Sequence, residues 1–175
     1  VFDQFHKEFY VYQDFISAGN HFGERGIMCN PGDEGSIPPM DEACATQPRS
    51  GTSCIKCTFV SQKSNWGGWY FMNNTLQGTQ TSPEQNWGEV PCGGYNLSGA
   101  TKLTFWARGE IGGERVRFFG FGIGRQAFTG KALKPYPDSC PQLSTGFLTL
   151  STNWTQYTID LTDQDLSRVL LGFAW

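Results

Sequence analysis

Short segments in which apolar and polar residues alternate, separated by glycine-rich turns, dominate this sequence. The clearest segment is Lys102 to Arg108, KLTFWAR, in which Leu103, Phe105 and Ala107 share one side of an extended chain. The segment Thr155 to Leu161, TQYTIDL, shows the same alternation. A period of two is typical of half-buried β-strands. The chain is therefore predicted to be an all-β sandwich of two antiparallel sheets.

Further strands are expected in the ranges 9–12, 54–61, 114–121 and 146–150. The strand 114–121 follows the turn Gly112-Gly113, so it is expected to pair with or neighbour 102–108. The strand 146–150 is expected to pair with 155–161 around the turn 151–153. Helical periodicity is confined to 162–169, enough for one or two turns. The irregular stretch 19–53 is a long loop that needs staples or an ion to fix it.

Length and charge restrict the classes of partner. The 175 residues suit one domain. A net charge of -3 gives no electrostatic reason to bind nucleic acid or an anionic membrane surface. No apolar stretch approaches the roughly 20 residues that a membrane span needs. We therefore expect neither a nucleic-acid partner nor a membrane span.

The cysteines point to an oxidising compartment. There are six of them in a small, loop-rich chain, which is typical of secreted proteins with a disulfide framework. The one CxxC motif has no second CxxC or histidine pair to complete a zinc site. One pairing is expected because it closes a short Pro/Gly/Ser loop with little strain, and two follow by elimination. The predicted disulfides are Cys44–Cys54, Cys92–Cys140 and Cys29–Cys57.

Three N-x-S/T sequons, at Asn73, Asn96 and Asn153, lie in turn-like stretches where a glycan could be tolerated. The start at Val1 without a signal peptide is expected of a mature, processed form. These features favour a secreted, extracellular glycoprotein, which could be displayed at a cell surface.

Several segments follow one another in a characteristic order. They are Tyr12 to Asp14, Asn20 to Phe22, Gly26 to Met28, Leu97 to Gly109, Tyr136 to Ser139, Trp154 to Leu161 and Leu171 to Trp175. Taken in this order, they resemble galactose-binding-like jelly rolls, a group that occurs as carbohydrate-binding modules and in bacterial surface proteins. The resemblance covers nearly the whole chain and implies a jelly-roll β-sandwich, to which the irregular stretch 19–53 adds a long stapled loop near the N-terminus.

The sequence departs from that group at both ends. Such domains usually carry one more strand after the position of Trp175, and a sandwich without it has an open edge and an exposed groove. At the other end, residues 1–8 precede the first family-like strand as an N-terminal arm, and residues 9–175 form the single sandwich domain. Phe2, Phe5 and Phe9 are large apolar groups outside the expected fold.

Aromatic residues beside small or polar ones are the candidates for sugar binding, because the C–H face of a pyranose packs on a ring. For any single ring, core packing is the competing interpretation. The candidates are Trp66, Trp69, Trp87, Tyr95 and Tyr136.

Acidic residues near the long loop are candidate calcium ligands, because calcium recurs as a structural ion in the resembled folds and takes hard oxygen ligands. Asp14, Glu24 and Asp33 are the first choices, with Glu34 and Asp41 nearby. No Asp-x-Asp-x-Asp spacing supports them, so solvated loop acids are the competing interpretation.

No catalytic apparatus is recognisable, and the chain is predicted not to be an enzyme. Only His6 and His21 are available, and neither has a nucleophile at motif spacing. Glu110 and Glu114 imitate a glycosidase pair, but surface ion pairing with nearby arginines is the ordinary explanation.

Two functions of different classes follow. In the first, the chain is a structural subunit of a surface fibre, in which the arm with Phe2, Phe5 and Phe9 fills the open groove of the next copy. In the second, it is a carbohydrate-binding module from a larger glycan-active protein. The first explains both departures from the resembled group.

Overall fold

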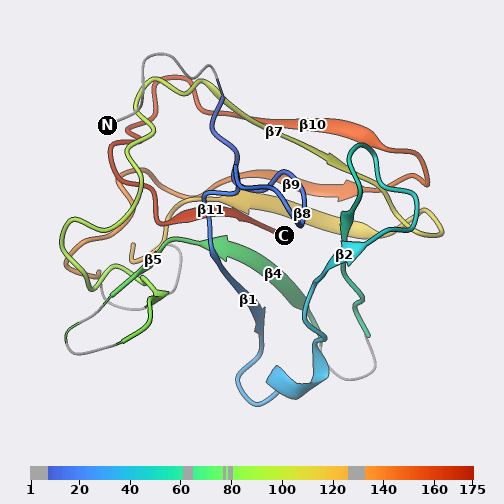
Figure 1. Ribbon diagram of the computed structural model, residues 1–175, viewed down its shortest axis with the longest axis horizontal. Helices are drawn as coiled ribbons and strands as arrows, with labels where there is room; N and C mark the ends of the chain where they lie inside the picture. Colours follow the sequence, from blue (N-terminus) through green and yellow to red (C-terminus); the bar gives the residue numbers. More distant parts are fainter. Residues whose placement is uncertain (1–7, 61–64, 77, 79–80, 126–132) are drawn as a thin grey trace.

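The computed structural model describes residues 8–60, 65–76, 78, 81–125 and 133–175, and strands make up its regular structure (Figure 1). Within these residues the helical content is one short 3-10 turn, η1, Glu34–Ser36. The predicted all-β sandwich is therefore confirmed. The long loop 19–53 is broken by β1, η1 and β2, and no disulfide staples it.

The larger layer is a five-stranded antiparallel sheet with strand order β1-β4-β11-β8-β9. Strand β4 lies inside this sheet, and five of its six residues are buried. A strand that is covered on both faces has a continuous apolar sequence without alternation, which explains GGWYFM. The strands are β1 Glu24–Cys29, β4 Gly67–Met72, β11 Leu171–Ala174, β8 Arg115–Gly120 and β9 Leu143–Thr149.

The smaller layer is a ribbon of two antiparallel strands, β7 Lys102–Ala107 and β10 Thr155–Asp160 (Figure 1, top). Its register sets Phe105 opposite Tyr157 and Leu103 opposite Ile159, so the apolar side predicted for both strands faces the larger sheet. Two small hairpins complete the fold. They are β2 Asp41–Cys44 with β3 Cys54–Lys56, and β5 Asn74–Thr75 with β6 Glu84–Gln85.

The core lies between the two layers, with a second cluster on the outer face of the larger sheet. Between the layers, Phe22 and Phe71 are each 1% exposed. On the outer face, Tyr70, Met72 and Leu170 pack together. Both faces of the central strands are thus covered, which stabilises the larger sheet by removing apolar area from water.

Two of the predicted strand pairings are wrong. The strand predicted at 102–108 pairs with β10, whereas the one predicted at 114–121 pairs with β9 and β11 in the other layer. The expected hairpin of 146–150 with 155–161 is likewise split between the layers. The reason lies in the turn after β7, where Gly109 N and Gly113 N donate to the carbonyls of Ser151 and Leu150. The β7–β8 connection and the β9–β10 connection are therefore bonded to each other, and each leads the chain from one layer to the other.

Two other predicted elements are not formed. Residues 9–12 belong to no strand, and the carbonyls of Tyr10 and Val11 accept from the backbone N–H groups of His21 and Phe22. Residues 162–169 form turns instead of a helix. The side chains of Asp160 and Asp165 accept hydrogen bonds from the backbone N–H groups two residues later, at Thr162 and Ser167. Such local bonds compete with a helix.

Candidate functional site

A large groove between the two layers is the main concave feature of the molecule. Its volume is about 1720 Å³, and aromatic rings line its floor. Phe105 of β7 lies 4.6 Å from Phe118 and 4.7 Å from Phe173, and Phe173 lies 5.5 Å from Trp175, measured between ring centroids. An apolar groove of this length can take a chain segment as well as a small ligand.

One wall of the groove is the edge of strand β7. Among the described residues, β7 pairs with β10 alone, so its other edge carries unpaired backbone N–H and C=O groups. All six residues of β7 line the groove. An extended segment laid beside β7 would therefore find backbone partners along one side and aromatic rings beneath it.

A second wall arises where β11 ends between two longer neighbours. Trp175 exchanges backbone hydrogen bonds with Trp69 of β4, and Ala174 is the register partner of Phe119 of β8. A Cβ on Gly68 would lie 2.4 Å from the carbonyl oxygen of Trp175, so only glycine fits this approach. The first residues of β4 and β8 extend beyond this point and line the groove.

The β2–β3 hairpin and the N-terminal segment border the groove. The guanidinium of Arg49 lies 4.2 Å from the ring centroid of Trp106, and Trp154 Nε1 donates to the carbonyl of Gln47 at 3.1 Å. These two contacts fix the hairpin tip against the smaller layer. Residues 8–13 of the N-terminal segment also line the groove.

Phe9, one of the three expected assembly residues, packs on its own domain. Its ring stacks on His21 at a centroid distance of 4.1 Å and meets Tyr95 edge-on at 5.2 Å. Phe9 is therefore not free to bind a neighbouring copy in this conformation. Phe2 and Phe5 lie outside the described residues.

All six cysteines carry free thiols, and the structure forms none of the three predicted disulfides. It does place Cys44 directly opposite Cys54 in the β2–β3 hairpin, with Cys54 Sγ 3.4 Å from the carbonyl oxygen of Cys44. Of the other expected pairs, Cys92 is exposed whereas Cys140 is buried, and Cys29 and Cys57 are half-buried. Burial raises the pKa of both Cys57 and Cys140 to about 12, so these two thiols are protonated at neutral pH.

The structure scatters the five aromatic residues proposed for sugar binding. Trp69 is buried in the core, and its Nε1 donates to the carbonyl of Pro38 at 2.8 Å. Tyr95 packs on the core cluster, and Tyr136 is half-buried. Trp66 is 44% exposed and borders the groove, where its Nε1 donates to Asn30 Oδ1. Packing accounts for the rings of Trp69 and Tyr95, and sugar binding by the five residues stays a prediction.

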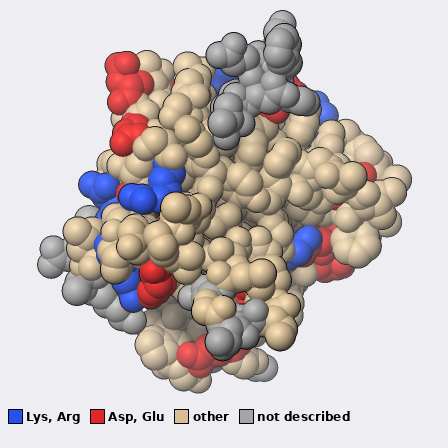
Figure 2. All heavy atoms as spheres, turned by 60° about the vertical axis from the view of Figure 1, so that its left-hand side comes forward, with Lys and Arg blue, Asp and Glu red and all other residues tan. Residues whose placement is uncertain are grey.

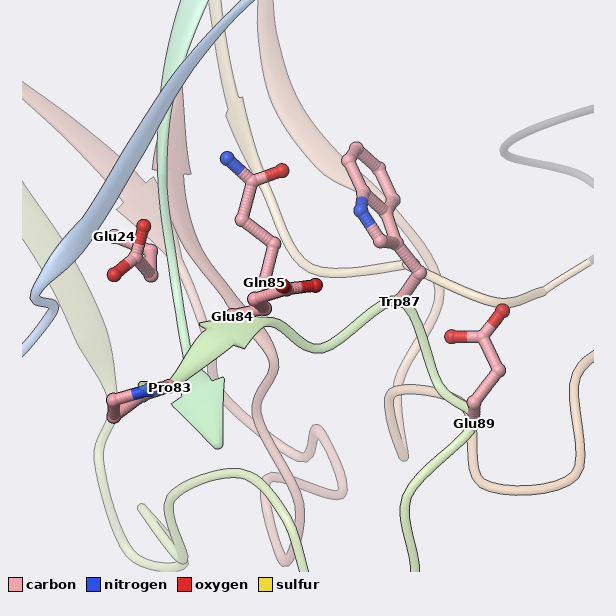
Figure 3. Close-up of a pocket in the computed structure, with 6 residues that line it drawn as sticks. All are labelled: Glu24, Pro83, Glu84, Gln85, Trp87 and Glu89. Carbon is pink, nitrogen blue, oxygen red and sulfur yellow. The ribbon is translucent and has the colours of Figure 1, made fainter. Parts of the chain in front are cut away.

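Trp87 borders a separate hollow of about 560 Å³, outside the groove (Figure 3). Its ring is 37% exposed and meets Tyr70 edge-on at 5.7 Å. Gln85 beside it is held at both ends, since Tyr70 Oη donates to its Oε1 at 2.8 Å and its Nε2 donates to the carbonyl of Arg25 at 3.3 Å. The amide is therefore held in place, and the indole packs beside it on Tyr70.

Carboxylates surround this hollow, and sequence reasoning identified only one of them. Glu24, Glu84 and Glu89 line it together with Pro83, as Figure 3 shows. Glu89 also accepts from Lys134 Nζ at 2.5 Å. Glu84, Gln85 and Glu89 belong to no recognisable sequence motif. They meet Glu24 only because the fold brings β1 beside the β5–β6 hairpin.

The predicted calcium ligands do not converge. Asp14 accepts hydrogen bonds from Thr52 and Ser53 and thereby ties the N-terminal segment to the end of the β2–β3 loop. Glu24 lies at the Trp87 hollow, and Asp33 precedes η1. Within the described ranges, no three His, Cys, Asp or Glu side chains gather to hold a metal ion.

The sequons differ in accessibility. Asn73 is 7% exposed and its Oδ1 accepts from the backbone N–H of Gly94, so this structure leaves no room for a glycan there. Asn96 and Asn153 are exposed. The expectation that all three sites tolerate a glycan is therefore wrong for Asn73.

The acidic residues that imitate a catalytic pair have structural partners. Glu110 forms an ion pair with Lys56 at 3.2 Å, and Glu114 Oε1 accepts from the backbone N–H groups of Glu110 and Ile111. His21 Nδ1 lies 2.8 Å from the carbonyl oxygen of Tyr10, and His6 is outside the described residues. These contacts account for both glutamates as parts of the β7–β8 turn.

Figure 2 shows a face that is mostly uncharged, with small groups of acidic and basic side chains, some of them next to each other. Among the described residues, no helix has the length and apolar character to cross a bilayer. Comparison with protein-family models, with curated proteins and with solved structures finds no match for this chain. The likeness to galactose-binding-like jelly rolls stays a prediction from the sequence.

Proposed function

We propose that this chain is a non-catalytic structural subunit whose groove accepts an extended segment of a second copy, and that repetition of this contact builds an extracellular fibre. The observation that carries the proposal is the groove itself. It offers an apolar floor of aromatic rings next to an unpaired strand edge. Those are the two features that strand donation requires, since the donor gains both burial and backbone hydrogen bonds.

The donor in this proposal is the N-terminal arm, residues 1–8. Because Phe9 is anchored on its own domain, the arm starts from a fixed point beside the groove. Eight extended residues reach at most about 26 to 29 Å, whereas the six residues of β7 span about 20 Å. The arm is long enough to lie along the whole edge of β7 in a neighbouring copy.

Removal of residues 1–8 should convert an assembling protein into a monomer that can still accept an arm. We expect the full chain to form larger species as its concentration rises in size-exclusion chromatography with light scattering. The truncated chain should elute as a monomer over the same range. Fluorescently labelled truncated chain should nevertheless join assemblies of the full chain, because its groove is intact.

Two outcomes contradict the proposal. One is a truncated chain that still polymerises alone, and the other is a full chain that is monomeric at every concentration. The second outcome means that the arm closes the groove of its own domain. Thermal unfolding of both proteins provides the folding control.

A carbohydrate-binding role is the second candidate, and the Trp87 hollow favours it. An exposed indole stands there beside a fixed amide and three carboxylates, Glu24, Glu84 and Glu89. A ring face packs on the C–H groups of a sugar, while carboxylate oxygens accept from its hydroxyls. The hollow is open enough for one end of a saccharide chain.

Replacing Trp87 with alanine tests this second role. We expect a loss of about 1 to 3 kcal/mol in affinity for an oligosaccharide that the unmodified protein binds on a glycan array. Trp66→Ala is the matched control, since that ring lies at the groove and should leave the affinity unchanged. An array on which the unmodified protein binds nothing, or equal losses in both variants, would rule out the hollow.

A further inference from the structure

A row of alternating aromatic and guanidinium groups crosses the outer face of β8 and β9. The guanidinium carbon of Arg117 lies 5.2 Å from the ring centroid of Phe119 and 6.0 Å from that of Phe147. Arg115 lies 5.1 Å from Phe147 on the far side of the row. We call these four residues the arginine row. All four residues also border the groove, at the place where β8 extends beyond the end of β11.

A bulge in β9 places the exposed ring in this row. The register between β8 and β9 shifts after the pair Arg117–Phe147, and Gly146 adopts a φ of +68° at this point. Such a bulge changes the direction of the neighbouring side chain. Phe147 is 65% exposed although its neighbours on the inner face are packed. Burial therefore does not account for an aromatic residue at this position.

Neither guanidinium of the arginine row has an acidic partner among the described residues. The ion pairs recorded there are Arg25–Glu42, Lys56–Glu110 and Lys134–Glu89. Glu114, the acid next to Arg115 in sequence, turns its Oε1 toward the backbone of the β7–β8 turn. Within the part of the chain that the structure describes, the row thus holds two positive charges without an acidic partner, on a chain whose net charge is -3.

We propose that the arginine row binds an anionic polysaccharide, one whose sugar rings carry carboxylate or sulfate groups. A guanidinium presents planar N–H donors that match both groups in two-point contacts. The exposed part of Phe147 packs on the sugar between two charged groups. The row lies on the edge strand β9 and on its neighbour β8, at the border of the groove, so a linear polymer can pass over it.

Binding of two charged probes to the full chain tests this proposal, with polygalacturonate as the carboxylate probe and dextran sulfate as the sulfate probe. We expect at least one to bind, and more weakly when the ionic strength is raised, because salt screens exposed charges. The double variant Arg115→Gln/Arg117→Gln should lower the affinity at least about tenfold, since hydrogen bonds to charged groups are each worth about one tenfold step. Whichever probe loses affinity identifies the charged group that is recognised.

The matched control removes the same charge elsewhere. Arg49→Gln/Arg108→Gln deletes two guanidiniums that lie over Trp106 and Trp154 in the smaller layer, and should leave the affinity within about twofold. Phe147→Ala should weaken binding of the polysaccharide but not of polyglutamate. The proposal is overturned if neither probe binds, if the two double variants lose affinity equally, or if polyglutamate binds as tightly as the sugars. Thermal unfolding of each variant excludes loss of fold as the cause.

Discussion

Replacing Phe71 with alanine should lower the free energy of unfolding by about 3 to 5 kcal/mol, the range for removing a buried aromatic ring. Phe71 is 1% exposed and stands on β4 inside the larger sheet. Its ring stacks on Tyr12 at 5.3 Å and lies 6.0 Å from Trp175. The cavity would therefore loosen the N-terminal segment and the end of β11 together.

Phe147→Ala is the control for this prediction, because it removes the same atoms from a ring that is 65% exposed. Its effect on the free energy of unfolding should stay within about 0.5 kcal/mol. Urea unfolding followed by tryptophan fluorescence measures both variants. Equal losses in the two variants would mean that Phe71 is not part of a packed core.

Replacing Asp138 with alanine should be the other strongly destabilising change. Asp138 is 1% exposed, and its carboxylate accepts from the backbone N–H of Ile123 at 2.7 Å and from that of Leu170. It joins the loop after β8 to the residue that precedes β11. Without the carboxylate both donors are buried and unpaired, at a cost of about 1 to 3 kcal/mol each.

The same residue makes the stability depend on pH. Burial is the main cause that raises the pKa of Asp138 to about 7, from an ordinary value of 3.8. Between these two pH values the folded protein holds a proton that the unfolded chain has released. This contribution to the free energy of unfolding is therefore fully present below about pH 4 and is lost as the pH rises to about 7.

Asp138→Asn separates the titration from the packing, because an amide keeps the shape but cannot ionise. We expect the difference in free energy of unfolding between the parent protein and this variant to change between about pH 4 and 7 and to level off above it. Urea titrations at a series of pH values provide the measurement. A difference that is constant over that window would contradict the raised pKa.

The alternating strands could be predicted from the sequence because each has one buried face. The segments 102–108 and 155–161 form β7 and β10 within a residue at each end, and 114–121 contains β8. Strand β4 was missed because burial on both faces removes the alternation, and GGWYFM then resembles a loop with aromatics. Strand β11 was missed for the same reason, since Leu171, Gly172 and Ala174 are all buried.

The partners of each strand could not be predicted, since pairing depends on contacts between distant segments. Gly112-Gly113 has the composition of a hairpin turn, yet the bonds from Gly109 and Gly113 to the 150–151 turn lead the chain into the other layer. The candidate sites show the same limit. Trp87 was among the candidates, but Glu84 and Glu89 join it only through the β5–β6 hairpin and the loop that follows.

The central place of β11 also determines when the larger sheet can assemble during synthesis. β4 and β8 lie on either side of β11, so the half of the sheet with β1 and β4 stays separate from the half with β8 and β9 until residues 171–174 have been made. The other four strands of the larger sheet are therefore synthesised before the strand that joins its two halves. Until then the edges of β4 and β8 that pair with β11 remain open, and open strand edges of this kind favour aggregation.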